Sequence, residues 1–157
     1  MFLVVIMVVL MYPSFSTGIV ILKITDSGER IGGTLFIRCR DIAVHRVGEA
    51  ESIGWISLAN QTERYDLVAL GNASETIARL RVPTGRYDKI RFSVSEAVLT
   101  VNGTETNLGT RAEKFASPLE FSVTSKETVL VIDFRTNFRQ SLNQKTYRAL
   151  PTAHVQT

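Results

Sequence analysis

The sequence predicts an all-β protein, an antiparallel β-sandwich that is preceded by an apolar N-terminal segment. Three observations predict this class: apolar and polar residues alternate over short runs, turn-forming residues separate these runs, and little of the chain repeats at helical spacing. Roughly eight short strands with regular turns favour a sandwich. A chain of 157 residues is long enough for one domain with a sizeable core.

The N-terminal segment predicts export. The first 22 residues carry no charged side chain, and the run Met1–Tyr12 is apolar. Such a run is short for a membrane-spanning helix, which needs about 20 residues, but it fits the core of a secretory signal. Small residues place the candidate cleavage site between Ser16 and Thr17. We expect residues 1–16 to be a signal peptide or a retained segment, and residues 17–157 to be a single β-sandwich domain.

Two alternatives concern a retained segment. If it is not cleaved, it would anchor the domain at a membrane, although Pro13 disfavours a straight helix. Its high content of Val and Ile also favours a strand, which would complete the sheet of a neighbouring subunit in a filament. The segment lacks the basic residues that usually begin a secretory signal, so both alternatives stay open.

The first half of the domain reads as strands and turns. Ile19–Thr25 alternates between apolar and other residues, which predicts the first strand. In the next strand the apolar phase shifts after Cys39, which predicts a β-bulge near Arg40–Asp41. Two short strands and one stretch that is compatible with either a helix or a strand follow; they are Gly54–Leu58, Arg64–Leu70 and Glu75–Arg81.

The second half contains the longest strand signal. It begins after the turn Pro83-Thr84-Gly85 and shifts its apolar phase before Ala97. Asn102-Gly103 follows it and predicts a type I′ hairpin, because both central residues of that turn need a positive φ. The remaining expected segments are strands around Phe121 and Ile132, a polar loop to about Lys145, and an extended piece at Tyr147–Val155.

Three Asn-x-Ser/Thr sequences, at Asn60, Asn72 and Asn102, are candidate glycosylation sites. With six Asn and 28 Ser or Thr residues, chance would give about one such sequence. All three fall in predicted loops or turns, where an oligosaccharide would reach solvent. The alternative is that they are only turn-forming asparagines. Together with the N-terminal segment, they predict an extracellular or cell-surface protein.

The cysteine and histidine residues give no catalytic signature. Cys39 is the single cysteine, so no intramolecular disulfide forms, and its apolar strand pattern favours a buried inert thiol. A dyad of Cys39 with His45 is the less favoured alternative. His45 and His154 are far apart in the sequence and lack the paired spacing of a zinc site. We therefore expect no catalytic residues, no metal and no cofactor.

Several acidic and aromatic residues are compatible with either a binding role or a purely structural one. The candidate oxygen ligands for calcium are Asp26 with Glu29, or Glu49 with Glu51, but solvated turn carboxylates are more common. Asp133 is expected to face outward and to pair with Arg38 or Arg91. Three aromatic side chains either stack on a sugar ring or, by default, pack in the core or at its rim; they are Trp55, Tyr65 and Tyr87.

The charge of the chain says little about partners. The net charge is +3 and the pI is about 9.2, which is weak support for any polyanion. We expect no nucleic-acid partner. The expected partners are other cell-surface proteins or glycans, with self-association as a further option, and a membrane only through a retained N-terminal segment.

Several short pieces, taken in order, resemble a known family. Their order and spacing carry the resemblance, and examples are Val44-His45-Arg46, Gly54-Trp55, Tyr65–Leu70, Pro83–Tyr87, Leu99–Gly103 and Val129–Phe134. Over Ile19–Val155 the chain resembles the family called domain of unknown function 4382, found in exported prokaryotic proteins. The Pro-x-Gly-x-Tyr turn is also similar to that of transthyretin-like and carboxypeptidase-regulatory sandwiches. The resemblance implies an immunoglobulin- or transthyretin-like fold and an exported setting, but no established activity.

The sequence thus predicts a non-enzymatic, exported cell-surface module that is adhesive, structural or ligand-binding and acts through loops on a rigid scaffold. The alternative is a subunit of an extracellular filament or sheath, assembled through the apolar N-terminal strand in donor-strand fashion. An enzyme would need both histidines or several carboxylates to converge in one pocket.

Overall fold

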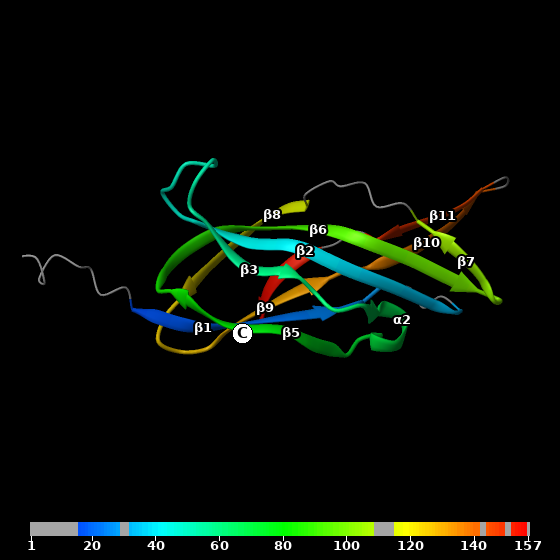
Figure 1. Ribbon diagram of the computed structural model, residues 1–157, viewed down its shortest axis with the longest axis horizontal. Coiled ribbons are helices and arrows are strands. Elements are labelled where there is room, and N and C mark those ends of the chain that lie inside the picture. Colours follow the sequence, from blue (N-terminus) through cyan, green and yellow to red (C-terminus); the bar gives the residue numbers. More distant parts are fainter. Residues whose placement is uncertain (1–15, 29–31, 109–114, 142–143, 150–151, 157) are drawn as a thin grey trace, which may run out of the picture.

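The computed structural model describes residues 16–28, 32–108, 115–141, 144–149 and 152–156. Two β-sheets are packed face to face, so the predicted all-β sandwich is confirmed (Figure 1). Among the described residues, a two-stranded hairpin and one short helix accompany them. The candidate N-terminal segment Met1–Tyr12 lies outside the described residues. In the described part of the chain, no helix is long and apolar enough to cross a membrane.

The smaller sheet has four strands in the order β12-β9-β1-β5. The neighbours β1 and β9 are parallel, whereas the other pairs are antiparallel as predicted. A parallel pair needs a long crossover, and here the strands of the larger sheet supply it. The strands of this sheet are β1 (Thr17–Thr25), β5 (Ser74–Pro83), β9 (Thr128–Asp133) and β12 (Thr152–Gln156).

The larger sheet has six strands and contains β6, the longest of the strands that the structure describes. Its main path is β3-β2-β6-β7, while β4 pairs with β2 and β8 pairs with β6. All of these pairs are antiparallel. The strands are β2 (Thr34–Arg46), β3 (Trp55–Gln61), β4 (Tyr65–Asp66), β6 (Gly85–Val101), β7 (Thr104–Asn107) and β8 (Phe115–Val123).

The inward faces of the two sheets form one hydrophobic core. Alternation buries every second residue of the central strands, for example Leu22 of β1 and Ile90 of β6, which are both fully buried. Phe92 and Phe134 meet in the core with ring centroids 6.1 Å apart and tilted by 59°. Burying each such large side chain contributes about 1.5–3 kcal/mol. This core holds the outward faces rigid, and the candidate site lies on one of them.

Two local predictions from the sequence are confirmed. Asp41 has a φ of 53°, and the pairing of β2 with β6 shifts between Arg40 and Ala43, which is the predicted bulge. Asn102 and Gly103 have φ values of 50° and 76° and close the hairpin between β6 and β7. Both features are determined locally, because few residue types tolerate a positive φ.

Other elements differ from the prediction. The expected strand Arg64–Leu70 is only a two-residue strand followed by helix α2 (Leu67–Leu70). Asp66 ends the strand because its carboxylate accepts a hydrogen bond from the Val68 amide, as an N-cap does. The ambiguous stretch Glu75–Arg81 is strand, within β5. The expected polar loop is instead the hairpin of β10 (Thr136–Ser141) and β11 (Gln144–Ala149).

Candidate functional site

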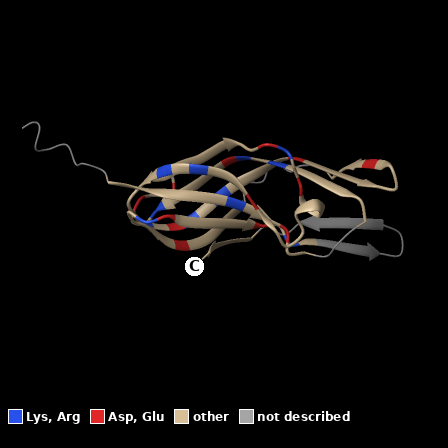
Figure 2. Ribbon diagram, turned by 90° about the horizontal axis from the view of Figure 1, so that it is seen from below, with Lys and Arg blue, Asp and Glu red and all other residues tan. Residues whose placement is uncertain are grey.

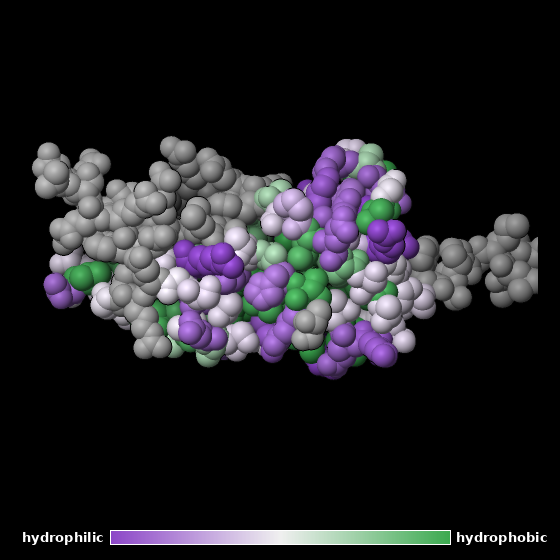
Figure 3. Space-filling model, turned by 180° about the vertical axis from the view of Figure 1, so that it is seen from behind, coloured by the Kyte–Doolittle hydropathy of each residue, from purple (hydrophilic) through white to green (hydrophobic). Residues whose placement is uncertain are grey.

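The connection between β2 and β3, residues 47–54, stands out from one end of the sandwich; we call it the β2–β3 loop (Figure 1). In the view from behind, it is the mostly hydrophilic projection at the upper right (Figure 3). Backbone hydrogen bonds close it: the Arg46 amide donates to the Gly54 carbonyl at 3.0 Å, and the Ile53 amide donates to Ala50 at 2.9 Å. The loop therefore has a defined shape.

His45 lies under this loop and is only 2% exposed. Its Nδ1 atom is 2.8 Å from Oδ1 of Asp88, and its Nε2 atom is 3.3 Å from the carbonyl oxygen of Ala50. The two ring nitrogens thus lie next to one oxygen in β6 and one oxygen in the loop. His45 therefore ties the loop, through Ala50, to strand β6.

Trp55 anchors the other side of the loop. It pairs with His45 in the β2–β3 register, and the two ring centroids are 5.0 Å apart. Its indole Nε1 donates to the carbonyl of Glu51 at 2.9 Å, and Lys89 forms an ion pair with the Glu51 carboxylate. The guanidinium of Arg91 lies 4.1 Å above the Trp55 ring, which places a cation over its face.

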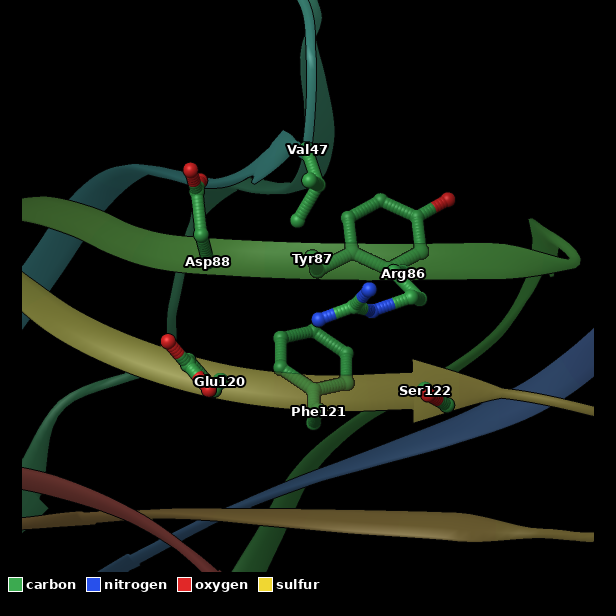
Figure 4. Close-up of a pocket in the computed structure, with 7 residues that line it drawn as sticks. All are labelled: Val47, Arg86, Tyr87, Asp88, Glu120, Phe121 and Ser122. Atoms are coloured by element: carbon green, nitrogen blue, oxygen red, sulfur yellow. The ribbon is translucent and has the colours of Figure 1, made fainter.

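A pocket of about 340 Å³ opens beside the loop, on strands β6 and β8 (Figure 4). Its wall is Val47, whose amide donates to the Arg86 carbonyl at 3.0 Å. Tyr87 and Phe121 also line it; they pair across β6 and β8 and stack with centroids 5.1 Å apart. The polar lining consists of Arg86, Asp88, Glu120 and Ser122.

The strand register brings these polar residues together. Arg86 and Ser122 are direct partners across β6 and β8. Asp88 lies where both pairings of β6 shift, with β2 on one side and β8 on the other. Bulges redirect side chains, and here Asp88 both contacts His45 and lines the pocket. The site thus joins a loop, a buried imidazole and an open polar pocket.

The three candidate glycosylation sites are all exposed. Asn72 lies in the turn after α2 and Asn102 in the β6–β7 hairpin, as predicted. Asn60 was expected in a loop but belongs to β3, which ends one residue later at Gln61, the partner of Arg40 in β2. The turn after α2 and the β6–β7 hairpin lie at the end of the sandwich opposite the β2–β3 loop (Figure 1).

The candidate cleavage site lies at the start of the first strand. Ser16 is the first described residue and Thr17 begins β1. The carbonyl of Ser16 accepts a hydrogen bond from the Thr84 amide at 2.8 Å. Ser16 and Thr17 are both exposed. Glycosylation and cleavage at these positions remain predictions.

Cys39 and His45 do not form a dyad. The Cys39 thiol is fully buried in the core, and burial raises its pKa to about 12. His45 instead contacts Asp88 on the outer face of the same sheet. His154 is exposed on β12 of the smaller sheet, where it pairs with Val131 of β9. The expected buried thiol is confirmed.

Of the candidate calcium ligands, the structure describes Asp26, Glu49 and Glu51. Glu29 lies outside the described residues, and Glu51 is engaged with Lys89. Asp26 accepts hydrogen bonds from the amides of Gly28 and Thr136. Within the described ranges, no group of three or more His, Cys, Asp or Glu side chains is placed to hold a metal ion.

The expectation for Asp133 was wrong. It does not face outward or pair with Arg38 or Arg91; it is 4% exposed at the end of β9. Burial alone would raise its pKa, but hydrogen bonds from Ser27 and Arg135 outweigh that effect and lower it. The prediction failed because Ser27, in the turn after β1, donates two hydrogen bonds to the Asp133 carboxylate, and alternation does not reveal contacts between residues so far apart in the sequence.

The aromatic residues follow the default of core or rim packing. Tyr87 is 1% exposed and its hydroxyl donates to the Pro83 carbonyl at 2.7 Å. Arg91 covers Trp55, and Tyr65 is partly buried against the core. Sequence reasoning missed the pocket residues Arg86, Asp88, Glu120 and Ser122. Their only signal was the alternation of polar residues along two strands, whose pairing the sequence does not specify.

Charges of both signs are mixed along the strands of the sandwich (Figure 2). Comparison with known proteins identifies one family: the model described as "Domain of unknown function (DUF4382)" matches residues 17–149. No curated protein and no solved structure is significantly similar to the chain.

Proposed function

Since the chain belongs to the DUF4382 family, a domain of unknown function, we propose from its geometry that it is a non-enzymatic, exported cell-surface recognition module. Its binding surface is the β2–β3 loop together with the pocket beside it. The sandwich serves as the rigid scaffold, and the partner is another cell-surface protein or a glycan.

One observation carries this proposal. Among the described residues, the large hydrophobic side chains that are exposed are Val47, at 40%, and Ile53, at 59%, and both belong to the β2–β3 loop. Exposed apolar side chains on a soluble surface often mark interaction sites. His45 and Trp55 hold this loop from below, so it is ordered before it binds, which lowers the entropy cost of association.

The positions of the candidate glycosylation sites also support the β2–β3 loop as the binding surface. Asn72 and Asn102 lie at the opposite end of the sandwich, so oligosaccharides there would leave the loop accessible (Figure 1). The uncharged N-terminal segment supports export. A non-enzymatic role is supported by Cys39, which is buried in the core, and by His45, whose two ring nitrogens are both engaged.

The proposal is tested by binding of the labelled full-length chain to envelopes of the cells that produce it. The double variant Val47→Ser, Ile53→Ser should bind about tenfold more weakly or worse, because burying each of these side chains against a partner contributes about 1.5–3 kcal/mol. The control Ala69→Ser removes an exposed apolar side chain from α2, at the far end, and should bind as the wild type does. Equal binding by the loop variant and the control would contradict the proposal.

A further inference from the structure

The pocket is lined by four polar side chains, those of Arg86, Asp88, Glu120 and Ser122. Arg86, Glu120 and Ser122 are exposed, and their side chains contact no polar partner within the part of the chain that the structure describes. Asp88 is partly buried, and its Oδ1 atom is held by His45. In Figure 4, the guanidinium of Arg86 lies between strands β6 and β8, and the carboxylates of Asp88 and Glu120 lie to one side of it. Because all of these side chains line the same pocket, it offers both donors and acceptors to a ligand.

The site carries charges of both signs. Arg86 is positive, whereas Asp88 and Glu120 are negative. An anionic ligand would be repelled by the two carboxylates, and a cationic ligand by Arg86. A neutral ligand whose groups both donate and accept hydrogen bonds suits all of them, and a hydroxyl group does both.

On this basis the geometry points to one neutral sugar residue of a glycan as the occupant of the pocket. The inference rests on the proposed recognition function and names its ligand class. The hydroxyls would accept from Arg86 and donate to the carboxylates of Asp88 and Glu120, with Ser122 able to do either. Val47 would pack against the apolar C–H face of the ring.

The size and the lining agree with this assignment. A volume of about 340 Å³ is at the low end of the range for small-molecule pockets, which is about 300–1,000 Å³. One ring fits such a space, and the open side leaves room for the rest of a chain. Stacking on an aromatic face is not available here, because Tyr87 and Phe121 are both buried and Arg91 covers Trp55. Contact with the sugar is therefore mainly by hydrogen bonds and Val47.

The test is an amide chemical-shift titration of the ¹⁵N-labelled full-length chain. The probes are the methyl glycosides of glucose, galactose, mannose and N-acetylglucosamine, with N-acetylneuraminic acid and Nα-acetyl-lysine amide as anionic and cationic comparators. At least one neutral glycoside should shift the amides of Val47, Arg86, Asp88, Glu120 and Ser122 in a saturable manner. Neither charged comparator should do so at the same concentrations.

Single substitutions test whether the glycoside binds in this pocket. Arg86→Gln and Glu120→Gln should each weaken binding of that glycoside about tenfold, since each removes a charge-assisted hydrogen bond. Arg81→Gln and Glu75→Gln change the same residue types at exposed positions on β5 and should have no effect. The inference is overturned if no glycoside shifts these amides, or if only a charged comparator does.

The outcomes separate this inference from the proposed function. If envelope binding depends on Val47 and Ile53 but no glycoside binds, the recognition function stands and the sugar assignment fails. If a glycoside binds the pocket but envelope binding ignores the loop variant, the sugar assignment stands and the loop is not the recognition surface.

Discussion

The imidazole Nδ1 of His45 lies 2.8 Å from the carboxylate Oδ1 of Asp88 and so connects the two halves of the site. His45 is buried and holds the β2–β3 loop through the Ala50 carbonyl, whereas Asp88 lines the neighbouring pocket. The loop that carries Ile53 and the pocket that carries Arg86 therefore share one hydrogen-bonded support. A change at either residue is expected to affect both.

His45→Asn should loosen the loop. The amide can still donate to Asp88 but is too short to reach the Ala50 carbonyl, so one buried hydrogen bond is lost at a cost of about 1–3 kcal/mol. Hydrogen exchange should become faster for residues 47–54. Emission of Trp55, the single tryptophan, should change because its ring neighbour is altered. His154→Asn, at an exposed position on β12, should change neither; unchanged loop exchange in His45→Asn would refute this role.

Gly54→Ala should be markedly destabilising. Gly54 has a φ of 79°, and an added Cβ would lie 2.4 Å from the Cβ of Glu49. Gly48 has a similar φ of 88°, but an added Cβ there meets nothing within 4 Å. Gly48→Ala should therefore cost only the backbone strain, about 1 kcal/mol. Gly54→Ala should cost roughly 1–3 kcal/mol more by overpacking.

Equilibrium denaturant unfolding of both glycine variants measures this difference. Equal losses in the two variants would show that the loop accommodates the extra methyl group, and that its shape is not fixed as described.

Asp133→Asn should destabilise the protein in a pH-dependent manner. The pKa of Asp133 is lower in the folded protein than its ordinary value, because Ser27 and Arg135 donate hydrogen bonds that outweigh the effect of burial. Its stabilising contribution is then fully present above the unfolded pKa, about 3.9. It is lost as the pH falls through the lower folded value. The variant should lose about 1–3 kcal/mol at neutral pH and progressively less towards pH 2.

The control for this prediction is Asp41→Asn. The Asp41 side chain is 55% exposed, and asparagine tolerates its positive φ. It should lose little stability at any pH. A loss in Asp133→Asn that does not change with pH would contradict the stated cause.

Cys39 should be unreactive in the folded protein. Its thiol is fully buried with a pKa raised to about 12, and only the thiolate attacks disulfide reagents. An aromatic disulfide reagent at pH 8 should label it rapidly in denaturant and, in the native protein, only at the rate of unfolding. Rapid labelling of the native chain would show that the core around Cys39 opens.

The sequence predicts the features that depend on neighbouring residues. The alternation of β1, the bulge at Asp41 and the turn at Asn102 are all local, and all are confirmed. The site depends on non-local register. Arg86 and Ser122 meet only because β8 pairs with β6, and the hairpin with β7 intervenes along the chain. The contact of His45 with Asp88 was not predicted, because Asp88 is placed by two register shifts that no sequence pattern reveals.

Site-specific photo-crosslinking tests the central claim most directly, because it reports which face meets the partner. A photoreactive side chain is placed in turn at Ile53, Glu120, Glu75 and Arg81 in the full-length chain, which is then irradiated on envelopes of the producing cells. Adducts should form from positions 53 and 120, on the loop and the pocket. Adducts from positions 75 and 81 on β5, with none from positions 53 and 120, would contradict the claim.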